Sequence, residues 1–206
     1  MAEDGPDRLE PDALQRTTVL VAGGAGAVGN AAIQLARWAG ANVVATVSDA
    51  AKARHARAAG AHHVVNYRDP DAVEQIRRVT PGGVRLVVEV AAGVNAELDL
   101  AVLQPRGTIA IYGTEGGAPF APDVGRSMGL NGRYQFVLLY TVGRERIAAA
   151  ASDINRALGE GALGIGEEHG LPLHQFALED TANAHRAVEN HVTGKVLIRV
   201  GGDDQP

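Results

Sequence analysis

The segment from Val19 to Gly29 constrains the fold more than any other part of the chain. An apolar run, VLVA, is followed directly by the glycine-rich sequence GGAGAVG and then by a helical pattern. This order is typical of the first turn of a dinucleotide-binding βαβ unit. In that turn Gly24 permits the tight bend, Gly26 lets the backbone approach a pyrophosphate, and Gly29 lets the helix pack closely on the strand. The segment therefore predicts an anion site at a helix N-terminus.

Predicted strands and helices alternate along residues 17–143. Strands are predicted at 18–22, 42–47, 63–65, 85–90 and 108–112, and helices at 30–39, 49–59, 71–79 and 95–103. A largely apolar segment at 134–141 predicts a sixth strand. Right-handed crossovers between such units give a parallel sheet with helices on both faces. We therefore expect an α/β fold with a doubly wound, Rossmann-type parallel sheet.

The pattern changes after residue 143. A helix is predicted at 144–158, then a glycine-rich link without regular structure, a helix at 179–190 and a strand at 196–200. We therefore divide the chain into a polar tail (1–16), a dinucleotide-binding domain (17–143), a C-terminal segment (144–200) and a second tail (201–206). Both tails are polar and unpatterned, so we expect them to be mobile.

Composition excludes several classes of function. The 206-residue chain has no cysteine, which rules out thiol nucleophiles, disulfides and cysteine-ligated zinc within it. Its net charge of −5 argues against an extended nucleic-acid surface. No apolar run reaches membrane-spanning length, and the acidic start is unlike a signal peptide. We predict a cytoplasmic enzyme domain with neither nucleic acid nor membrane as a partner.

No acid–base centre or metal site is evident. None of the four tyrosines is followed four residues later by lysine, and no Gly-x-Ser-x-Gly or Walker lysine occurs. His62 and His63 form the sole histidine cluster, but neighbours on a strand point to opposite faces, so we interpret them as structural. Glu89 is a charge inside an apolar strand, and we expect it to be hydrogen-bonded to the glycine turn. We assign no catalytic residue and no metal.

Several phrases together resemble a known family. They are VLVAGGAGAVGNAAIQLARWAGANVVATV, AAGAHHVVNYRD, GGVRLVVEVA, LAVLQPRGTIAIYG, FVLLYTV and AHRAVENHVTGKVLI. Over about residues 17–200 the chain resembles the cofactor domain of medium-chain dehydrogenases and reductases, specifically the zinc-free quinone reductases related to zeta-crystallin. The resemblance implies an N-terminal catalytic domain before the glycine motif, where only sixteen polar residues stand here. It also implies that the segment after Arg144 belongs with that catalytic domain.

The end of the second predicted strand favours NADPH over NADH. Val47 occupies the place where NAD-preferring dehydrogenases carry an acid for the ribose hydroxyls. Ser48 offers a hydroxyl nearby, and the resemblance implies that Lys52 and Tyr67 bind the 2′-phosphate. A charge-assisted contact to phosphate is stronger than a neutral hydrogen bond. Two alternatives stay open: Lys52 as an exposed helix residue, and Asp49 as either a ribose ligand or only a helix N-cap.

The resemblance also places the nicotinamide half of the cofactor. It should lie at the carboxyl ends of the fourth to sixth strands, near 90–92, 112–114 and 136–138, where a doubly wound sheet has its crevice. The alternative for the last group is plain core or a dimer contact. The full set of predicted cofactor contacts is Gly24, Gly26, Ala27, Val28, Gly29, Ser48, Lys52, Tyr67, Ala91, Gly113, Thr114, Phe136, Val137 and Leu138.

These observations lead to one functional prediction and one rival. The prediction is an NADPH-dependent quinone or enone reductase, or the cofactor-binding part of one, that transfers hydride without a metal. The rival is a non-catalytic NADP(H)-binding module; a zinc alcohol dehydrogenase fragment is disfavoured because the phrases match the zinc-free branch. We also predict a homodimer in which strands 134–141 of two chains pair antiparallel, with Val137→Pro disrupting it.

Overall fold

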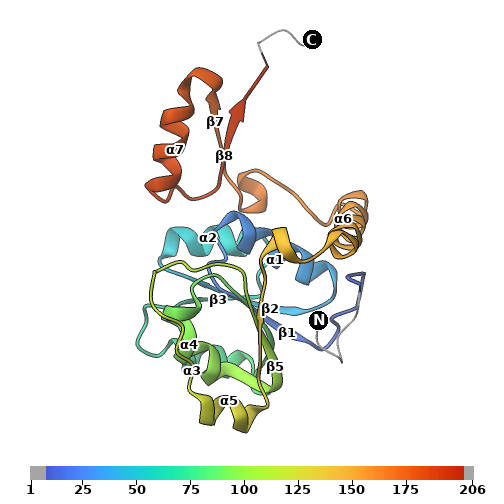
Figure 1. Cartoon of the computed structure of the whole chain (residues 1–206), viewed down its shortest axis with the longest axis vertical. Helices are drawn as coiled ribbons and strands as arrows, with labels where there is room; N and C mark the ends of the chain where they lie inside the picture. The colour runs from blue at the N-terminus through green and yellow to red at the C-terminus, as the bar shows by residue number, and fades with distance from the viewer. Residues whose placement is uncertain (1–7, 202–206) are drawn as a thin grey trace.

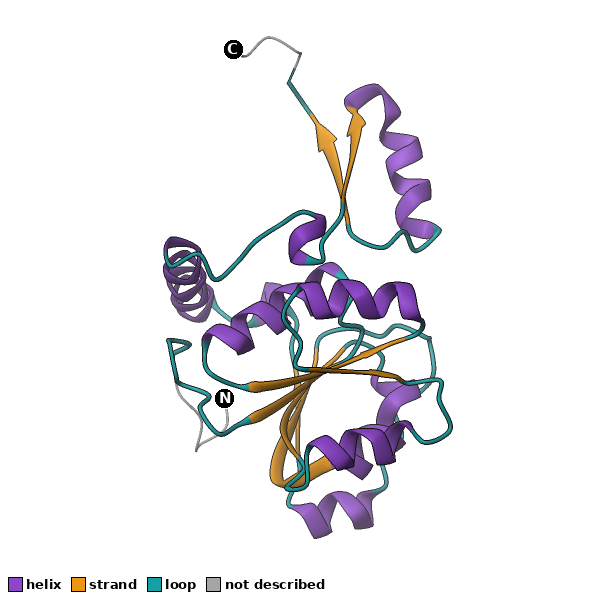
Figure 2. Ribbon diagram, turned by 180° about the vertical axis from the view of Figure 1, so that it is seen from behind, coloured by secondary structure: helices purple, strands orange, loops and turns teal. Residues whose placement is uncertain are grey.

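The computed structural model describes residues 8–201 and contains a six-stranded parallel sheet with helices on both faces (Figures 1 and 2). The strand order is β3-β2-β1-β4-β5-β6. The strands are β1 (Thr18–Val21), β2 (Asn42–Val47), β3 (His63–Asn66), β4 (Val84–Glu89), β5 (Leu103–Ile111) and β6 (Arg133–Phe136). The helices of this sheet domain are α1 (Ala27–Trp38), α2 (Ala50–Ala58), α3 (Ala72–Val79), α4 (Ala92–Val102) and α5 (Val124–Leu130). This confirms the doubly wound, Rossmann-type fold.

Two hydrophobic cores hold the helices against the sheet. Side chains alternate along β1, so Val19 and Val21 pack with Ile33 of α1 on one face. Leu20, between them, packs with Ile76 of α3 on the other face. The central strands are covered on both sides and are therefore almost entirely apolar.

The sixth strand is shorter than the sequence predicts. It ends at Phe136, and Leu139–Thr141 forms a 3-10 helix instead of more strand. Phe136 is in register with Ile111, the last residue of β5. Residues beyond Phe136 therefore have no neighbouring strand to continue the pairing, although the Val137 N–H still donates to the Ile111 carbonyl at 2.8 Å.

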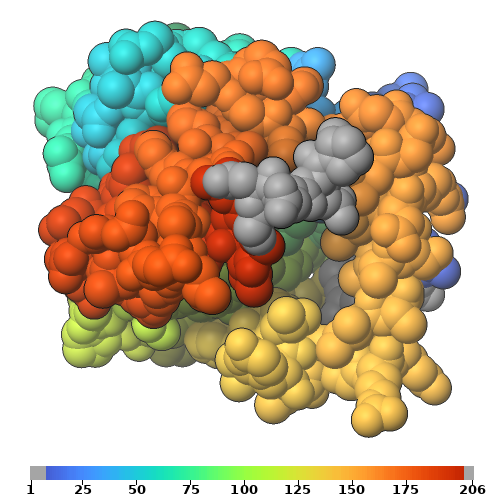
Figure 3. Space-filling model, turned by 90° about the horizontal axis from the view of Figure 1, so that it is seen from above, coloured from blue at the N-terminus to red at the C-terminus, as the bar shows by residue number. Residues whose placement is uncertain are grey.

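The C-terminal segment forms a second, smaller unit. It begins with α6 (Arg144–Gly159). The strands β7 (Leu173–Ala177) and β8 (Lys195–Arg199) then pair in parallel, and α7 (Thr181–Glu189) connects them. The sequence predicted only irregular structure where β7 lies. Figure 3 shows this segment, orange to red, lying across the top of the sheet domain.

Residues 8–16, predicted as part of a mobile tail, contact the folded domain. Arg8 Nη2 donates to Asp153 Oδ1 of α6 at 2.5 Å, and the Leu9 N–H donates to Asp153 Oδ2 at 2.9 Å. Leu14 packs against the core beside α1. The remainder of that tail and residues 202–206 of the second tail lie outside the described residues. Within residues 8–201, no helix combines the length and apolar character needed to cross a bilayer.

Candidate functional site

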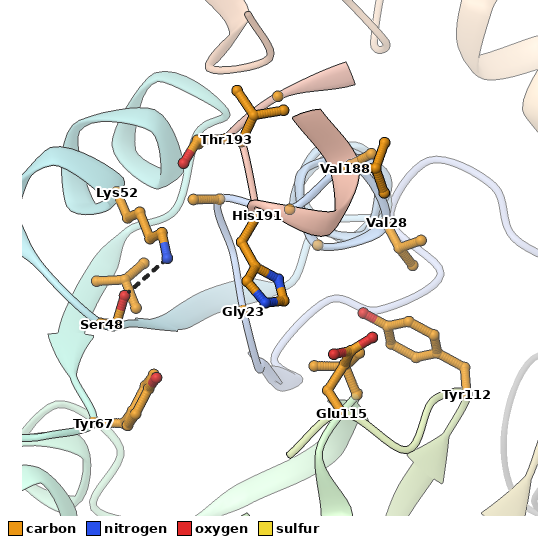
Figure 4. A pocket seen from close by; sticks show the side chains of 18 residues that line it. Gly23, Val28, Ser48, Lys52, Tyr67, Tyr112, Glu115, Val188, His191 and Thr193 are labelled. Carbon is orange, nitrogen blue, oxygen red and sulfur yellow. Dashed lines mark hydrogen bonds between the residues drawn. The ribbon is translucent and has the colours of Figure 1, made fainter. Parts of the chain in front are cut away.

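A cavity of about 610 Å³ opens at the carboxyl ends of the strands (Figure 4). It lies where the strand order reverses between β1 and β4, the position at which doubly wound sheets bind ligands. Its walls come from the glycine turn, the ends of β2 to β5, and the connection between α7 and β8. The lining residues are Gly23, Ala25, Gly26, Ala27, Val28, Gly29, Val47, Ser48, Lys52, Tyr67, Val90, Tyr112, Glu115, Val188, His191, Val192, Thr193 and Gly194.

The glycines of the turn do not all have the roles that the sequence predicts. The tight bend is made by Gly23, which has a φ of +67°. Gly24 serves packing instead, because a Cβ there would come within 2.8 Å of the Ala45 side chain. Gly29 lies against the Gly23 carbonyl and leaves no room for a side chain. A Cβ on Gly26 would meet only the Gly23 carbonyl oxygen at 3.4 Å, so Gly26 keeps the backbone open to the cavity.

The start of α1 is suited to an anion. The helix begins at Ala27, earlier than the sequence predicts, with Gly26 as N-cap and no side-chain cap among the described residues. Ala27, Val28 and Gly29, the first three residues of the helix, all line the cavity. Their N–H groups have no partner within the helix, and the helix dipole is positive at this end. The turn can therefore hold a phosphate without any charged side chain.

A short hydrogen-bond chain lies at the β2 end of the cavity. Lys52 Nζ donates to Ser48 Oγ at 3.0 Å, and Ser48 Oγ donates to Asp49 Oδ2 at 3.0 Å (Figure 4 shows the first). Asp49 Oδ1 accepts the Lys52 backbone N–H at 2.9 Å as the N-cap of α2. These bonds, from Lys52 first and Ser48 second, hold the pKa of Asp49 below its ordinary value. Of the two roles left open for Asp49, the structure shows the N-cap.

Tyr67 lies on the same side of the cavity as Ser48 and Lys52 (Figure 4). It follows β3 directly, and its backbone N–H donates to the Val47 carbonyl at 3.0 Å. The phenol is 39% exposed and faces the cavity. The structure thus brings together Ser48, Lys52 and Tyr67, as the sequence predicted.

The C-terminal segment supplies lining residues that the sequence analysis missed. They are Val188 in the last turn of α7 and residues 191–194 after it, among them His191, whose φ is +55°. In Figure 4 the His191 imidazole lies between the Ser48 and Lys52 side and the Tyr112 and Glu115 side. An imidazole at this place in the cavity can donate a hydrogen bond to an anionic group of a ligand.

Polar contacts hold the C-terminal segment over the glycine turn. Asn30 Nδ2 donates to the His169 carbonyl at 2.7 Å. Gln34, one helical turn further along α1, accepts the Gly164 N–H at 2.7 Å and donates to the Gly164 carbonyl at 3.1 Å. Asn30 and Gln34 are amide side chains on the buried face of α1. Buried amides need hydrogen-bond partners, and this need was the sequence signal from which the contact could have been predicted.

The opposite end of the cavity is formed by β4 and β5. Val90, Tyr112 and Glu115 line it. The predicted contacts Ala91, Gly113 and Thr114 lie beside these residues: Ala91 pairs with Thr114 in an isolated bridge, and Gly113 packs on Val90. Burial, followed by the charges of Glu89 and Glu115, raises the pKa of Tyr112 to about 12, so its hydroxyl keeps its proton.

Three further predicted contacts, in addition to Gly24, Ala91, Gly113 and Thr114, do not line the cavity. Phe136, Val137 and Leu138 are 62%, 38% and 58% exposed and do not line it. The Phe136 ring instead packs edge-on against Phe120, with centroids 5.9 Å apart. The Val137 N–H is bonded to Ile111 within the chain, so Val137→Pro would break an internal bond and is a poor test of dimerisation.

Glu89 is buried, as predicted, but its partner differs. Its carboxylate accepts from the Ala91 backbone N–H and from Asn95 Nδ2 at 3.1 Å, and not from the glycine turn. Glu89 ends β4, so its side chain folds back on the first turn of α4. His62 is likewise bound internally, with Nδ1 accepting the Val43 N–H at 2.9 Å. Residues 8–201 contain no group of three potential metal ligands.

Comparison with known proteins assigns the family. The sequence model of the zinc-binding dehydrogenase family matches residues 27–155. The chain belongs to this family. Within it, the chain is 31% identical over 176 residues to quinone oxidoreductase 1 of Escherichia coli, covering 82% of this chain and 52% of that protein. It is 32% identical over 187 residues to 2-haloacrylate reductase of a Burkholderia species, covering 87% and 54%.

A solved structure agrees with these relatives. The crystal structure of Escherichia coli quinone oxidoreductase complexed with NADPH superposes with a TM-score of 0.75 at 29% identity, over 93% of this chain and 58% of that one. The resemblance to the quinone reductase branch of the zinc-binding dehydrogenase family is therefore confirmed. The chain spans about half the length of these relatives and corresponds to their cofactor-binding half.

Proposed function

We propose that this chain is the cofactor-binding half of an NADPH-dependent quinone or enone reductase. The observation that carries the proposal is the β2 end of the cavity. Lys52 Nζ and Ser48 Oγ lie 3.0 Å apart there with Tyr67 beside them, while Asp49 is occupied as a helix cap. This end offers a cation and hydroxyl donors, which suit a 2′-phosphate better than a ribose hydroxyl pair.

The remaining walls suit the rest of the dinucleotide. The open backbone at Gly26 and the uncapped N-terminus of α1 would hold the pyrophosphate, with His191 above it. Val90, Tyr112 and Glu115 would enclose the nicotinamide end, with Ala91, Gly113 and Thr114 behind them. When bound, NADPH supplies the hydride, and the protein orients the ring and shapes the space around it.

The relatives support this reaction class. Their names, quinone oxidoreductase and 2-haloacrylate reductase, describe reductases of small molecules, and one of the solved structures holds NADPH. We propose a small-molecule quinone or enone as the substrate. Residues 136–138 would contact it or the nicotinamide only after a change in their surroundings, since they lie outside the cavity.

The position of residues 136–138 outside the cavity favours a second candidate, a non-catalytic NADP(H)-binding module. NADPH oxidation in the presence of a quinone separates the two. Quinone-dependent turnover by this chain supports the reductase, whereas NADPH binding without turnover supports the module.

Cofactor choice has a direct test in the two lysines of the chain, Lys52 and Lys195. We expect Lys52→Ala to weaken NADPH binding by about 10- to 100-fold, the contribution of a charge-assisted contact, and to leave NADH binding almost unchanged. Lys195→Ala, on β8 and outside the cavity, is the matched control and should change neither. Calorimetric titration of both nucleotides measures this. Equal losses for NADPH and NADH would place Lys52 away from the 2′-phosphate.

We further propose that the chain acts in the cytoplasm as a homodimer, with no nucleic-acid or membrane partner. The edge strand β6 and the residues after it support a dimer, since Phe136, Leu138, Leu139 and Tyr140 are exposed, Tyr140 by 90%. Light scattering at micromolar concentration tests this. A dimeric mass that becomes monomeric in Tyr140→Ser with Leu139→Ser supports this contact, and a monomeric unmutated chain contradicts it.

A further inference from the structure

Two carboxyl groups lie near each other inside the protein, directly behind the β4 wall of the cavity. Glu89 is the last residue of β4, and Asp99 lies on α4. The two residues are 0% and 1% exposed. Asn95, which lies one helical turn before Asp99 on the same face of α4, donates to Glu89, so this face of α4 lies against the Glu89 carboxyl group. Two carboxylates in this position would repel one another without help from solvent.

Hydrogen-bond donors are divided unequally between the two groups. The Glu89 carboxylate accepts from the Ala91 N–H and from Asn95 Nδ2. Neither oxygen of Asp99 accepts a hydrogen bond from the described part of the chain. An ionised Asp99 would thus be buried without compensation, whereas a protonated Asp99 can donate its own O–H to Glu89.

The ionisable groups on the elements around α4 are compatible with a charged Glu89 and a neutral Asp99. Tyr112, the residue after β5, lies near Glu89, and its phenol keeps its proton. From α3, Arg77 donates to the Ala101 carbonyl, and from α5, Arg126 pairs with Glu97 on the exposed side of α4. Burial first, and then Glu89, raises the pKa of Asp99 well above its ordinary value.

The residues next to this pair form the cavity wall. Glu89 holds the Ala91 N–H at the turn from β4 into α4, and Ala91 bridges to Thr114. Val90, which lies between Glu89 and Ala91 in the sequence, lines the cavity, and its carbonyl accepts the Glu115 N–H at 2.9 Å. A change of charge at the pair would therefore act first on the Val90 and Ala91 backbone.

We propose that Glu89 and Asp99 share one proton and that the pair acts as a positioning device for the Val90–Ala91 wall of the cofactor site. This inference rests on the proposed NADPH site. Asp99 keeps the proton and donates it to Glu89, and the Glu89 charge fixes the Ala91 N–H. Loss of the shared proton places two charges behind the wall and disturbs the nicotinamide end.

A pH series with NADPH tests the positioning role. In the unmutated chain, affinity should fall by up to about tenfold for each pH unit above the pKa of Asp99. Asp99→Asn should remove this dependence, because an amide donates to Glu89 at every pH. Asp153→Asn is the matched control: the same substitution at another buried aspartate, outside the cavity, should keep the unmutated profile. Equal profiles for the unmutated chain and Asp99→Asn would overturn the proposal.

Carboxyl-detected ¹³C NMR of the full chain without ligand tests the shared proton separately. One carboxyl of the pair should titrate above the ordinary aspartate range, and the amide signals of Ala91 and Thr114 should follow the same curve. Ordinary titration of both carboxyls overturns the shared proton, and amide signals that do not follow overturn the positioning. If NADPH binds at no pH, the proposed function fails while these spectra still decide the inference.

Discussion

The two parts of the chain that enclose the cavity are held in place by different forces. In the sheet domain, residues 17–143, the central strands are packed on both faces, and Val21 and Val44 are fully buried. In the C-terminal segment, residues 144–200, most side chains are exposed. Hydrogen bonds attach that segment to the sheet domain, among them those from Asn30 and Gln34 to its backbone and from Trp38 to Glu160, together with a few buried residues such as Leu171. One half of the cavity is therefore fixed by hydrophobic packing, and the other half is tethered.

This difference determines how substitutions should act. A change in the packed half alters the surface that a ligand meets, because its backbone is fixed by two cores. A change in the tether alters where the second half lies, because a few hydrogen bonds set its position. The two kinds of change should be separable by measuring nucleotide affinity together with local hydrogen exchange.

The largest effect should come from Gly26→Val in the packed half. A Cβ at this position meets only the Gly23 carbonyl oxygen, at 3.4 Å, so the fold can accept a side chain. The valine methyl groups would then occupy the space proposed for the pyrophosphate. We expect NADPH affinity to fall by about 100-fold or more with little change in melting temperature. Calorimetry and thermal denaturation measure the two quantities.

Gly29→Ala provides the contrast. Its Cβ would collide with the Gly23 carbonyl, so this variant should lose stability by about 1–3 kcal/mol through overpacking. If Gly26→Val is folded and binds NADPH normally, the glycine turn serves packing alone. If both variants lose stability equally, the packed half is less tolerant than its contacts indicate.

The packed half is also the part that the sequence predicted well. The strand β2 spans the residues predicted for it, and Ser48, Lys52 and Tyr67 meet at one end of the cavity. The strand depends on a local signal, an apolar run bounded by glycine and polar residues. The roles of Lys52 and Tyr67 came from the family resemblance. The prediction that Gly24 makes the tight bend was wrong, because the residue with the positive φ is Gly23. The sequence does not show which of two adjacent glycines adopts that conformation.

A smaller effect should follow from breaking the tether. Asn30→Ala combined with Gln34→Ala removes the donors and acceptor that bind the His169 and Gly164 backbone. We expect faster hydrogen exchange in β7 and β8, unchanged protection in β1 and β2, and a loss of NADPH affinity of about tenfold, equivalent to one or two hydrogen bonds. The matched control is Gln175→Ala, an exposed amide on β7.

Two outcomes would change the comparison. Unchanged affinity despite faster exchange in β7 and β8 would mean that His191 and its neighbours line the cavity without contacting the nucleotide. Faster exchange in β1 and β2 as well would mean that the amides are part of the main core. Either result would change which residues belong to the packed half and which to the tethered half.

In the tethered half, α6, α7 and β8 lie close to where the sequence predicted them, but β7 and the packing of this half over the cavity were not predicted. The strand β7 is short and pairs with β8 across an intervening helix, so the contact that defines it is distant in sequence. His191 lines the same cavity as the glycine turn, and α1 binds the C-terminal segment at residues 164 and 169, far from His191 in sequence. The Glu89–Asp99 pair likewise joins a strand to the following helix, and only the unusual charge at Glu89 was visible in the sequence.

The smallest effect on binding is expected at the Arg8–Asp153 pair, which ties residues 8–9 to α6. The Arg8 hydrogen bond is the main cause that holds the pKa of Asp153 below its ordinary value. A lowered pKa gives stability that is present above the unfolded-state pKa of about 3.9 and is lost as pH falls through the folded-state pKa. Protection of α6 should therefore decrease on acidification, and Asp153→Asn should lower it at neutral pH and abolish that acid dependence.

Because α6 contributes no residue to the described cavity lining, Asp153→Asn should change NADPH affinity by less than about twofold, which is below 0.5 kcal/mol. Hydrogen exchange of α6 across a pH series, corrected for intrinsic rates, measures the first effect, and calorimetry measures the second. A tenfold loss of affinity would show that residues 8–16 act through α6 on the position of the C-terminal segment. The tether would then include the start of the chain, and the second half of the cavity would depend on contacts from both ends of the sequence.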